Sequence, residues 1–276
     1  MPLKKEESGR RSVQVEVEVP GTPEQVWQAI ATGPGVSSWF VPTQVEERDG
    51  RPVTITAQFG PGMDSVSTVT AWEPPHRFVA DSQDLGPNAP PIATEWTVEA
   101  RSGGTCVVRV VHSLFASSDD WDDQLVGFEF GWPKFFLLLR LYLTHFGGQS
   151  CSAFRVMDAA PAPEAKAWDA LTGPLGLAGA SMGQRWSTPP GVPRLAGLVE
   201  QTSEGERNNS LLLRLDEPAP GIVSLFALTM GGKAYLMLDF YLYGDRAAAA
   251  AARDEPLWRA WMSELCASID NQSNVA

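Results

Sequence analysis

The chain begins with a segment in which apolar and polar residues alternate. From Val13 to Val19, valine occupies every second position, with Gln or Glu between. A two-residue period places all the valines on one face, so this segment is predicted to be a half-buried strand. Pro20-Gly21 ends it, and Thr22-Pro23-Glu24 has the residue types favoured at the N-cap and first turn of a helix. We therefore expect a short helix with an apolar stripe of Val26, Trp27 and Ile30.

The same order of signals returns after residue 150. Ser152–Asp158 is predicted to be a strand, and Pro161–Pro163 opens a helix. The segment that follows, Ala167–Pro174, resembles Val26–Pro34 with one residue deleted, and its tryptophan stands 141 positions after the first one. This similarity indicates an internal repeat.

Each half of the chain also ends on an apolar helix. The first is predicted over Pro133–Phe146 and the second over Glu255–Ile269, with Ala247–Ala252 as a helix-prone connector before it. Because both starts and both ends match, we expect tandem domains over residues 12–147 and 151–270. The segment Gly147–Ser150 is expected to join them as a flexible junction.

Between the helices, both halves are predicted to form strands. In the first domain these are Val53–Phe59, Val66–Trp72, Arg77–Ser82, Ala93–Ala100 and Thr105–Leu114. In the second domain they are Gln184–Ser187, Leu195–Gln201, Leu211–Leu215, Ile222–Met230 and Ala234–Tyr243. Gly and Pro separate these strands at turns. The order predicts an α+β fold in which a curved antiparallel sheet wraps around one long C-terminal helix and leaves a cavity between them.

Charge and targeting signals exclude several classes of protein. With 21 Lys and Arg against 33 Asp and Glu, the net charge is −12, which argues against binding to nucleic acid or to anionic lipid. We find no apolar run of about 18 residues and no secretory signal. Three widely spaced cysteines, Cys106, Cys151 and Cys266, are expected to be reduced, so the sequence predicts a cytoplasmic protein without a membrane partner.

The aromatic residues of the first domain are its strongest chemical signal, because a pocket for an aromatic ligand needs such walls and a few polar groups. The alternative is a solid aromatic core. The candidate ligand-binding residues are Trp39, Phe40, Phe59, Trp72, Phe78, Trp96, Val108, Val110, His112, Phe128, Trp132 and Phe136.

His112 is the weak catalytic candidate among them. Arg109 should face water, which places Val108, Val110 and His112 on the inner face of their strand. A lone imidazole there can orient a ligand carbonyl or transfer protons, or it can simply be hydrogen-bonded in the core.

Neither a metal nor a cofactor is expected. The three histidines have no ligand spacing, and Asp119–Asp123 are expected to support a helix N-terminus instead of holding a cation. Gly179–Gly183 fits the G-x-S-x-G pattern of a nucleophilic serine, but no strand is predicted before it and no helix after it, so the match is expected to be fortuitous.

Five elements of the first domain resemble a known family in their order along the chain. They are Thr22–Ile30, Trp39-Phe40, Val69–Phe78, Gly104–Ser113 and Gly131-Trp132. This order resembles the domain similar to the C-terminal part of the Hsp90 ATPase activator, within the START-like (SRPBCC) helix-grip superfamily that includes polyketide cyclases. The resemblance covers about residues 12–147, and residues 151–270 match only in layout. It implies tandem helix-grip (START/Bet v 1-like) domains, the second being a diverged copy.

Three functions follow from this resemblance. The first is binding of a small hydrophobic or aromatic molecule in the cavity between sheet and helix. The second is a polyketide cyclase- or dehydratase-like enzyme using His112, which should place Asp, Glu, Tyr or Arg beside that ring. The third is a chaperone-assisting interaction protein like the Hsp90 activator, which should expose a patch for a protein partner.

Overall fold

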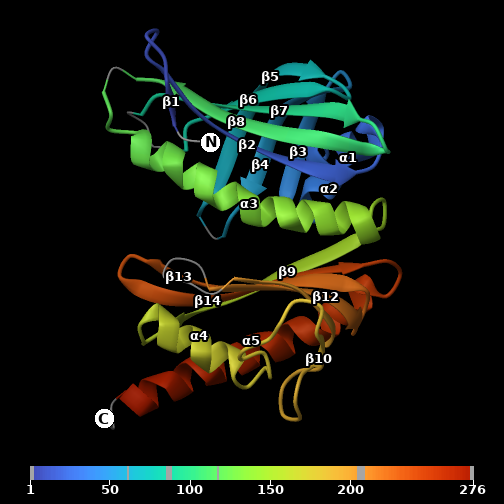
Figure 1. The fold of residues 1–276 in the computed structure, drawn as a ribbon, viewed down its shortest axis with the longest axis vertical. Helices are drawn as coiled ribbons and strands as arrows, with labels where there is room; N and C mark the ends of the chain where they lie inside the picture. Colours follow the sequence, from blue (N-terminus) through green and yellow to red (C-terminus); the bar gives the residue numbers. More distant parts are fainter. Residues whose placement is uncertain (1–2, 61, 85–88, 117, 204–208, 274–276) are drawn as a thin grey trace. The chain divides into compact units, whose positions relative to one another are not determined.

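A computed structural model describes residues 3–60, 62–84, 89–116, 118–203 and 209–273. Contacts within the chain divide it into two compact units, Met1–Gly148 and Gln149–Ala276. Each unit is an antiparallel sheet with a long helix at its C-terminal end (Figure 1).

The first domain contains one eight-stranded sheet and three helices. In chain order the elements are β1 (Lys4–Lys5), β2 (Arg10–Pro20), α1 (Pro23–Ala31), α2 (Gly33–Ser37), β3 (Thr43–Arg48), β4 (Arg51–Gln58), β5 (Asp64–Glu73), β6 (Arg77–Ser82), β7 (Ile92–Arg101), β8 (Thr105–Phe115) and α3 (Asp122–His145). The strand order is β1-β2-β8-β7-β6-β5-β4-β3. Strand β2 pairs with the last strand, β8, and β8 to β3 are neighbours in reverse chain order, as successive hairpins. Helix α3 lies across one face of the sheet (Figure 1).

The second domain repeats this plan with fewer strands. Its elements are β9 (Cys151–Ala160), α4 (Glu164–Thr172), β10 (Arg185–Ser187), β11 (Ala196–Ser203), β12 (Ser210–Glu217), β13 (Gly221–Met230), β14 (Lys233–Tyr243) and α5 (Ala247–Ser273). The order β10-β11-β12-β13-β14-β9 again pairs the first strand with the last. The predicted α+β architecture, with tandem sheets that each close on a long helix, is confirmed.

Most elements lie where the sequence predicts them. Every predicted strand between the helices is present within two residues of its expected ends. Thr22 caps α1 as expected, because its hydroxyl accepts a hydrogen bond from the Gln25 amide while the Gln25 side chain accepts one from the Thr22 amide. The structure adds three elements that we did not predict, β1, β3 and α2.

Both closing helices begin earlier than predicted, which corrects the expected starts at Pro133 and Glu255. Helix α3 starts at Asp122 and α5 at Ala247, so the expected connector forms the first turns of α5. Each helix therefore carries an internal proline, Pro133 or Pro256. Proline is favoured in the first turn of a helix and costs about 3 kcal/mol in its interior, which is why the pattern suggested a start there.

The acidic segment before α3 is held by basic residues of the first two strands. Arg11 forms ion pairs with Asp119 and Asp122, both at 2.7 Å, and Lys5 also contacts both carboxylates. Asp122 begins the helix, where a carboxylate is favoured by the helix dipole. The expected role at the helix N-terminus therefore applies to the first-turn residues Asp122 and Asp123, whereas the N-cap residue is Trp121, which makes no capping hydrogen bond with its side chain.

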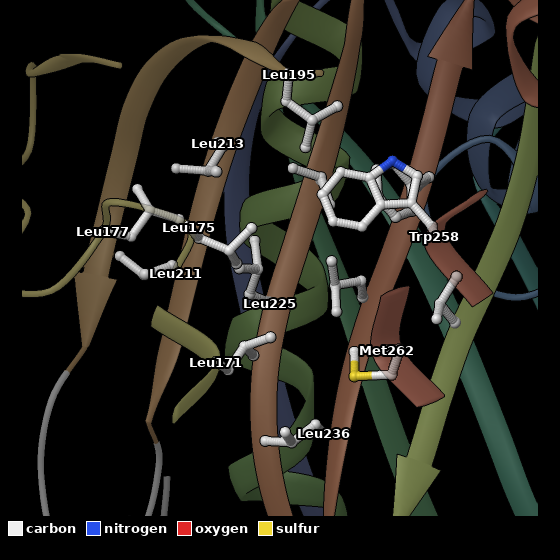
Figure 2. Packing of buried hydrophobic residues seen from close by; sticks show 14 of the residues in the cluster. Leu171, Leu175, Leu177, Leu195, Leu211, Leu213, Leu225, Leu236, Trp258 and Met262 are labelled. Atoms are coloured by element: carbon white, nitrogen blue, oxygen red, sulfur yellow. The ribbon is translucent and has the colours of Figure 1, made fainter. Parts of the chain in front are cut away.

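Side chains fill the interior of the second domain. Figure 2 shows leucines from the sheet, α4 and the following loop packed together with Trp258 and Met262 of α5. Leu171, Leu213, Leu236 and Trp258 are at most 1% exposed. This single cluster occupies the space between the sheet and α5.

The described helices include none that is both long enough and apolar enough to span a bilayer. All three cysteines are free thiols.

Candidate functional site

The first domain contains a cavity of about 700 Å³ between its sheet and the first half of α3. The inner face of the sheet forms one wall, α3 forms the opposite wall, and α1, α2 and the segment after them close the side. Its aromatic lining consists of Trp39, Phe40, Phe59, Phe78, Trp96, Phe128, Trp132 and Phe135.

These rings contact one another and form a continuous aromatic wall. The Phe40 ring is stacked 5.4 Å from that of Trp132 and lies edge-on to Phe135 at 4.5 Å. Trp96 stands edge-on to Trp132 at 5.0 Å and stacks with Phe78 at 6.2 Å. Such a wall offers faces and edges to a planar ligand, which can stack or approach edge-on.

Eight of the twelve predicted ligand-binding residues line this cavity, namely Trp39, Phe40, Phe59, Phe78, Trp96, His112, Phe128 and Trp132. The other four, Trp72, Val108, Val110 and Phe136, do not, and their predicted role as wall residues needs correction. Trp72 packs against Trp27 of α1, with ring centres 4.9 Å apart, and Phe136 packs behind Trp132 at 5.5 Å. Val108 and Val110 are 0% and 1% exposed in the closed part of the core. Strand alternation identifies the inner face correctly but does not show where along it the cavity ends.

His112 lies at the inner end of the cavity between two hydrogen-bonding partners. The indole N–H of Trp132 donates to Nε2 of His112 at 2.6 Å, and Nδ1 lies 3.0 Å from the Thr94 hydroxyl oxygen. The ring stacks on Phe128 at 4.3 Å, and only 5% of His112 is exposed. This burial lowers the pKa of His112 to about 3, so its ring is neutral near pH 7.

The contacts of His112 determine its tautomer. An indole N–H can only donate, so Nε2 must accept and carry no proton. The proton of the neutral ring is then on Nδ1, which donates to the Thr94 oxygen. Because its one free lone pair is used by Trp132, His112 has no lone pair available to take a proton from a substrate.

The cavity opens beside the connection between β4 and β5. Phe59 and Met63 line the mouth and are 38% and 46% exposed. The polar side of the mouth is Asp84, which accepts hydrogen bonds from Ser65 and Ser82 at 2.8 and 2.9 Å. The entrance therefore combines exposed apolar surface with two exposed carboxylates, those of Asp84 and Asp64.

Sequence reasoning missed Thr94, Met63 and Asp84, and it counted Phe135 among the aromatic residues of the first domain without selecting it as a ligand-binding candidate. For Thr94 a signal existed, since counting outward from the turn at Gly103-Gly104 places it directly opposite His112. The residues at the mouth had no such signal, because their approach depends on how two separate hairpins curve.

The second domain carries larger side chains at the positions that correspond to this end of the cavity. Val13 pairs with His112 in the first sheet, and Phe154, which follows Val13 by 141 positions like the repeated tryptophan, pairs with Phe240 in the second. Phe240 therefore takes the place of His112. Its ring stacks on Phe154 at 4.4 Å and packs 5.4 Å from Trp258.

The difference continues across the neighbouring strands. In the first domain Thr94 pairs with His112 and Ala80 pairs with Thr94. The corresponding second-domain pairs are Val223 with Phe240 and Leu213 with Val223. Val223 therefore takes the place of Thr94, and Leu213 takes the place of Ala80. These four positions form a row of paired residues across each sheet. In the second domain three of the four residues are larger and apolar, and both polar side chains are lost. This explains why the row is filled in the second domain and borders a cavity in the first.

No group of three or more His, Cys, Asp or Glu residues in the described parts of the chain is arranged to hold a metal ion.

Residues 10–130 match the family described as "Polyketide cyclase / dehydrase and lipid transport". No curated protein matches the chain. Among solved structures, the di-domain ARO/CYC BexL from the BE-7585A biosynthetic pathway is 14% identical, with 93% of this chain and 98% of BexL covered at a TM-score of 0.45. DynU16 from the dynemicin biosynthetic locus is 19% identical, with 94% and 96% covered at a TM-score of 0.40.

The Aha1 dimer from Colwellia psychrerythraea is 19% identical, with 50% of this chain and 98% of that chain covered at a TM-score of 0.38. Both sheets pair their first strand with their last, and residues 10–130 match the family above. The START-like helix-grip fold expected from the sequence is thereby confirmed, with the first domain carrying the family match and the second repeating its strand order.

Proposed function

We propose that the first domain binds a small aromatic or polycyclic molecule in its cavity. The observation that carries this proposal is a hollow of about 700 Å³ walled by contacting aromatic rings, with polar side chains as a minority of its lining. Ligand sites for small molecules have this size and composition. The family match supports the same substrate class, since its description names polyketides and lipids.

The contacts of His112 favour binding over catalysis by this residue. Both ring nitrogens are engaged, and the partners are Thr94 and Trp132 instead of the Asp, Glu, Tyr or Arg that the cyclase or dehydratase alternative requires. The family description includes cyclases, so an enzyme that only folds a reactive chain within the cavity is the second candidate. In that case His112 transfers no proton to or from the substrate.

A role as a chaperone-assisting interaction protein has less support. Its expected sign is an exposed apolar patch for a protein partner. In the first domain, exposed Phe59 and Met63 belong to the cavity wall itself, which favours their use in admitting a ligand. Val66 and Phe115 are also exposed and do not line the cavity, and they lie on different strands, β5 and β8.

A titration with 1-aminoanthracene tests the proposal, using fluorescence to follow binding to the full chain. We expect saturable binding of one molecule per chain. Ala80→Leu, which introduces the side chain found at the corresponding second-domain position, should weaken it about tenfold or more by filling the cavity. Ala100→Leu makes the same change at an exposed position of β7 and should leave the affinity unchanged.

Native mass spectrometry of the protein purified from its own cells complements the titration and should detect a retained apolar compound. Equal probe affinity for the wild type and Ala80→Leu would contradict the proposed site.

A further inference from the structure

Most hydroxyl groups around the cavity already use their hydrogen atoms within the protein. The Thr43 hydroxyl donates to the Val41 carbonyl at 2.9 Å. The hydroxyls of Ser65 and Ser82 both donate to the carboxylate of Asp84. A bound molecule therefore finds these three hydroxyl hydrogens already engaged.

Thr94 differs from these three because its oxygen accepts a hydrogen bond while its hydrogen is not engaged. Ser67 also lines the cavity, but the described residues form no hydrogen bond with its hydroxyl, so nothing orients it as His112 orients Thr94. Nδ1–H of His112 donates to the Thr94 oxygen, and the described residues offer no other hydrogen bond to this hydroxyl. Thr94 is half-buried and lines the cavity. Its hydroxyl hydrogen can therefore point into the space that a ligand would fill.

The direction of the whole chain of hydrogen bonds is set at Trp132. The indole N–H donates to Nε2 of His112, which keeps the proton on Nδ1, which in turn makes the Thr94 oxygen an acceptor. Each donor in such a chain polarises the next one and strengthens it as a donor. With its oxygen held in this way, Thr94 is oriented to donate onward.

We infer that the Thr94 hydroxyl donates a hydrogen bond to a ring carbonyl oxygen of the bound molecule, with Trp132 and His112 as the residues that position it. This inference rests on the proposed function and narrows its ligand class to aromatic ketones or quinones. A site that presents an unpaired donor discriminates against an analogue without the acceptor, because the donor then stays buried without a partner.

The second domain has no such chain at the corresponding place. Val223 and Phe240 stand where the first domain has Thr94 and His112, and neither side chain can form a hydrogen bond. Carbonyl recognition is therefore assigned to the first domain.

Two probes of nearly equal shape test the inference on the full-length protein. Fluorenone carries a ring carbonyl, and fluorene has a methylene group at the same place. The wild type should bind fluorenone more tightly than fluorene, and Thr94→Val should reduce that preference about tenfold while changing fluorene affinity little. Thr94→Ser, which keeps the hydroxyl, should retain the preference.

Thr68→Val is the matched control, because it makes the same threonine-to-valine change at an exposed position of β5 that does not line the cavity. It should leave the preference unchanged. In the wild-type complex the carbonyl stretching band of fluorenone should lie at lower frequency than in the Thr94→Val complex, since a carbonyl that accepts a hydrogen bond has a weaker C=O bond.

Nitrogen NMR and a Trp132→Phe variant test the positioning roles of Trp132 and His112 separately. Nitrogen NMR of the wild type should show His112 protonated on Nδ1, and Trp132→Phe should release Nε2, shift its resonance and lower the fluorenone preference. Protonation on Nε2 in the wild type would overturn the inference.

The outcomes separate this inference from the proposal beneath it. If both probes bind saturably and Thr94→Val keeps the full preference for fluorenone, the hydrogen bond is refuted and the binding function stands. If neither probe binds the wild type, the proposed function fails, and the inference fails with it.

Discussion

A buried imidazole normally needs either a charged partner or neutral hydrogen-bonding partners at both ring nitrogens. His112 has neutral partners at both nitrogens. Its ring lies between Trp132, Thr94 and the face of Phe128, and burial alone lowers its pKa to about 3. Burial penalises the charged form, and Nε2 cannot gain a proton without losing the Trp132 hydrogen bond. The residue is therefore a fixed neutral donor.

The low pKa of His112 predicts that stability falls in acid. Below a pKa of about 6.5 the unfolded chain takes up a proton that the folded chain binds only near pH 3. Unfolding therefore becomes easier as the pH falls through this window, by about 1.4 kcal/mol per pH unit from this residue alone. Urea unfolding at pH 7 and pH 5 should show that His112→Gln loses about 2 kcal/mol less than the wild type over this interval.

His76→Gln makes the same substitution at an exposed histidine and serves as the control. The same loss in His112→Gln as in the wild type would show that His112 does not stay neutral in the folded protein.

The sequence allowed the character of the site to be predicted, but not its extent. The aromatic wall and His112 follow from alternation along the strands and the excess of large rings. That Val110 is packed while its strand neighbour Trp96 lines the cavity depends on the path of α3 over the sheet, which no local pattern encodes.

At the scale of elements, the strands were predictable and the helix starts were not. Alternation and glycine turns mark strands locally, whereas β3 is largely charged and exposed and gave no signal. The starts of α3 and α5 were obscured by internal prolines. Proline destabilises a helix interior locally, but packing of the helix against the sheet can compensate for that cost, and a local sequence pattern does not show this packing.

Helix α3 also carries two glycines on the side that borders the cavity. Gly127 and Gly131 are one turn apart, and both line it. A β-carbon at either position would meet nothing within 4 Å. Their absence of a side chain therefore leaves space open beside Phe128 and Trp132.

Gly131→Ala should raise the stability of the protein and weaken ligand binding at the same time. Alanine in a helix interior is about 0.5–1 kcal/mol more favourable than glycine, so the unfolding free energy should rise by that amount. The added methyl group occupies part of the cavity, so 1-aminoanthracene should bind more weakly. Thr144→Ala, at an exposed position of the same helix, should stabilise without affecting binding, and unchanged affinity in Gly131→Ala would show that the ligand does not approach this part of α3.

At the scale of the whole molecule, two copies of one fold have diverged in their interiors. The row that reads Val13, His112, Thr94 and Ala80 in the first copy reads Phe154, Phe240, Val223 and Leu213 in the second. A helix-grip sheet can be closed by its own side chains or left open for a guest. We infer that the second copy contributes stability and the first contributes recognition.

This division of roles predicts that removing side-chain volume from the second domain affects stability and not ligand affinity. Leu213 is fully buried in the packed cluster, so Leu213→Ala should lower the unfolding free energy by about 2–5 kcal/mol. At temperatures where the variant remains folded, 1-aminoanthracene should still bind the first-domain cavity with the wild-type affinity. Urea unfolding and a fluorescence titration on the same preparation measure both quantities. Two probe molecules bound per wild-type chain, or a loss of first-domain affinity in Leu213→Ala, would show instead that the second domain shares in recognition.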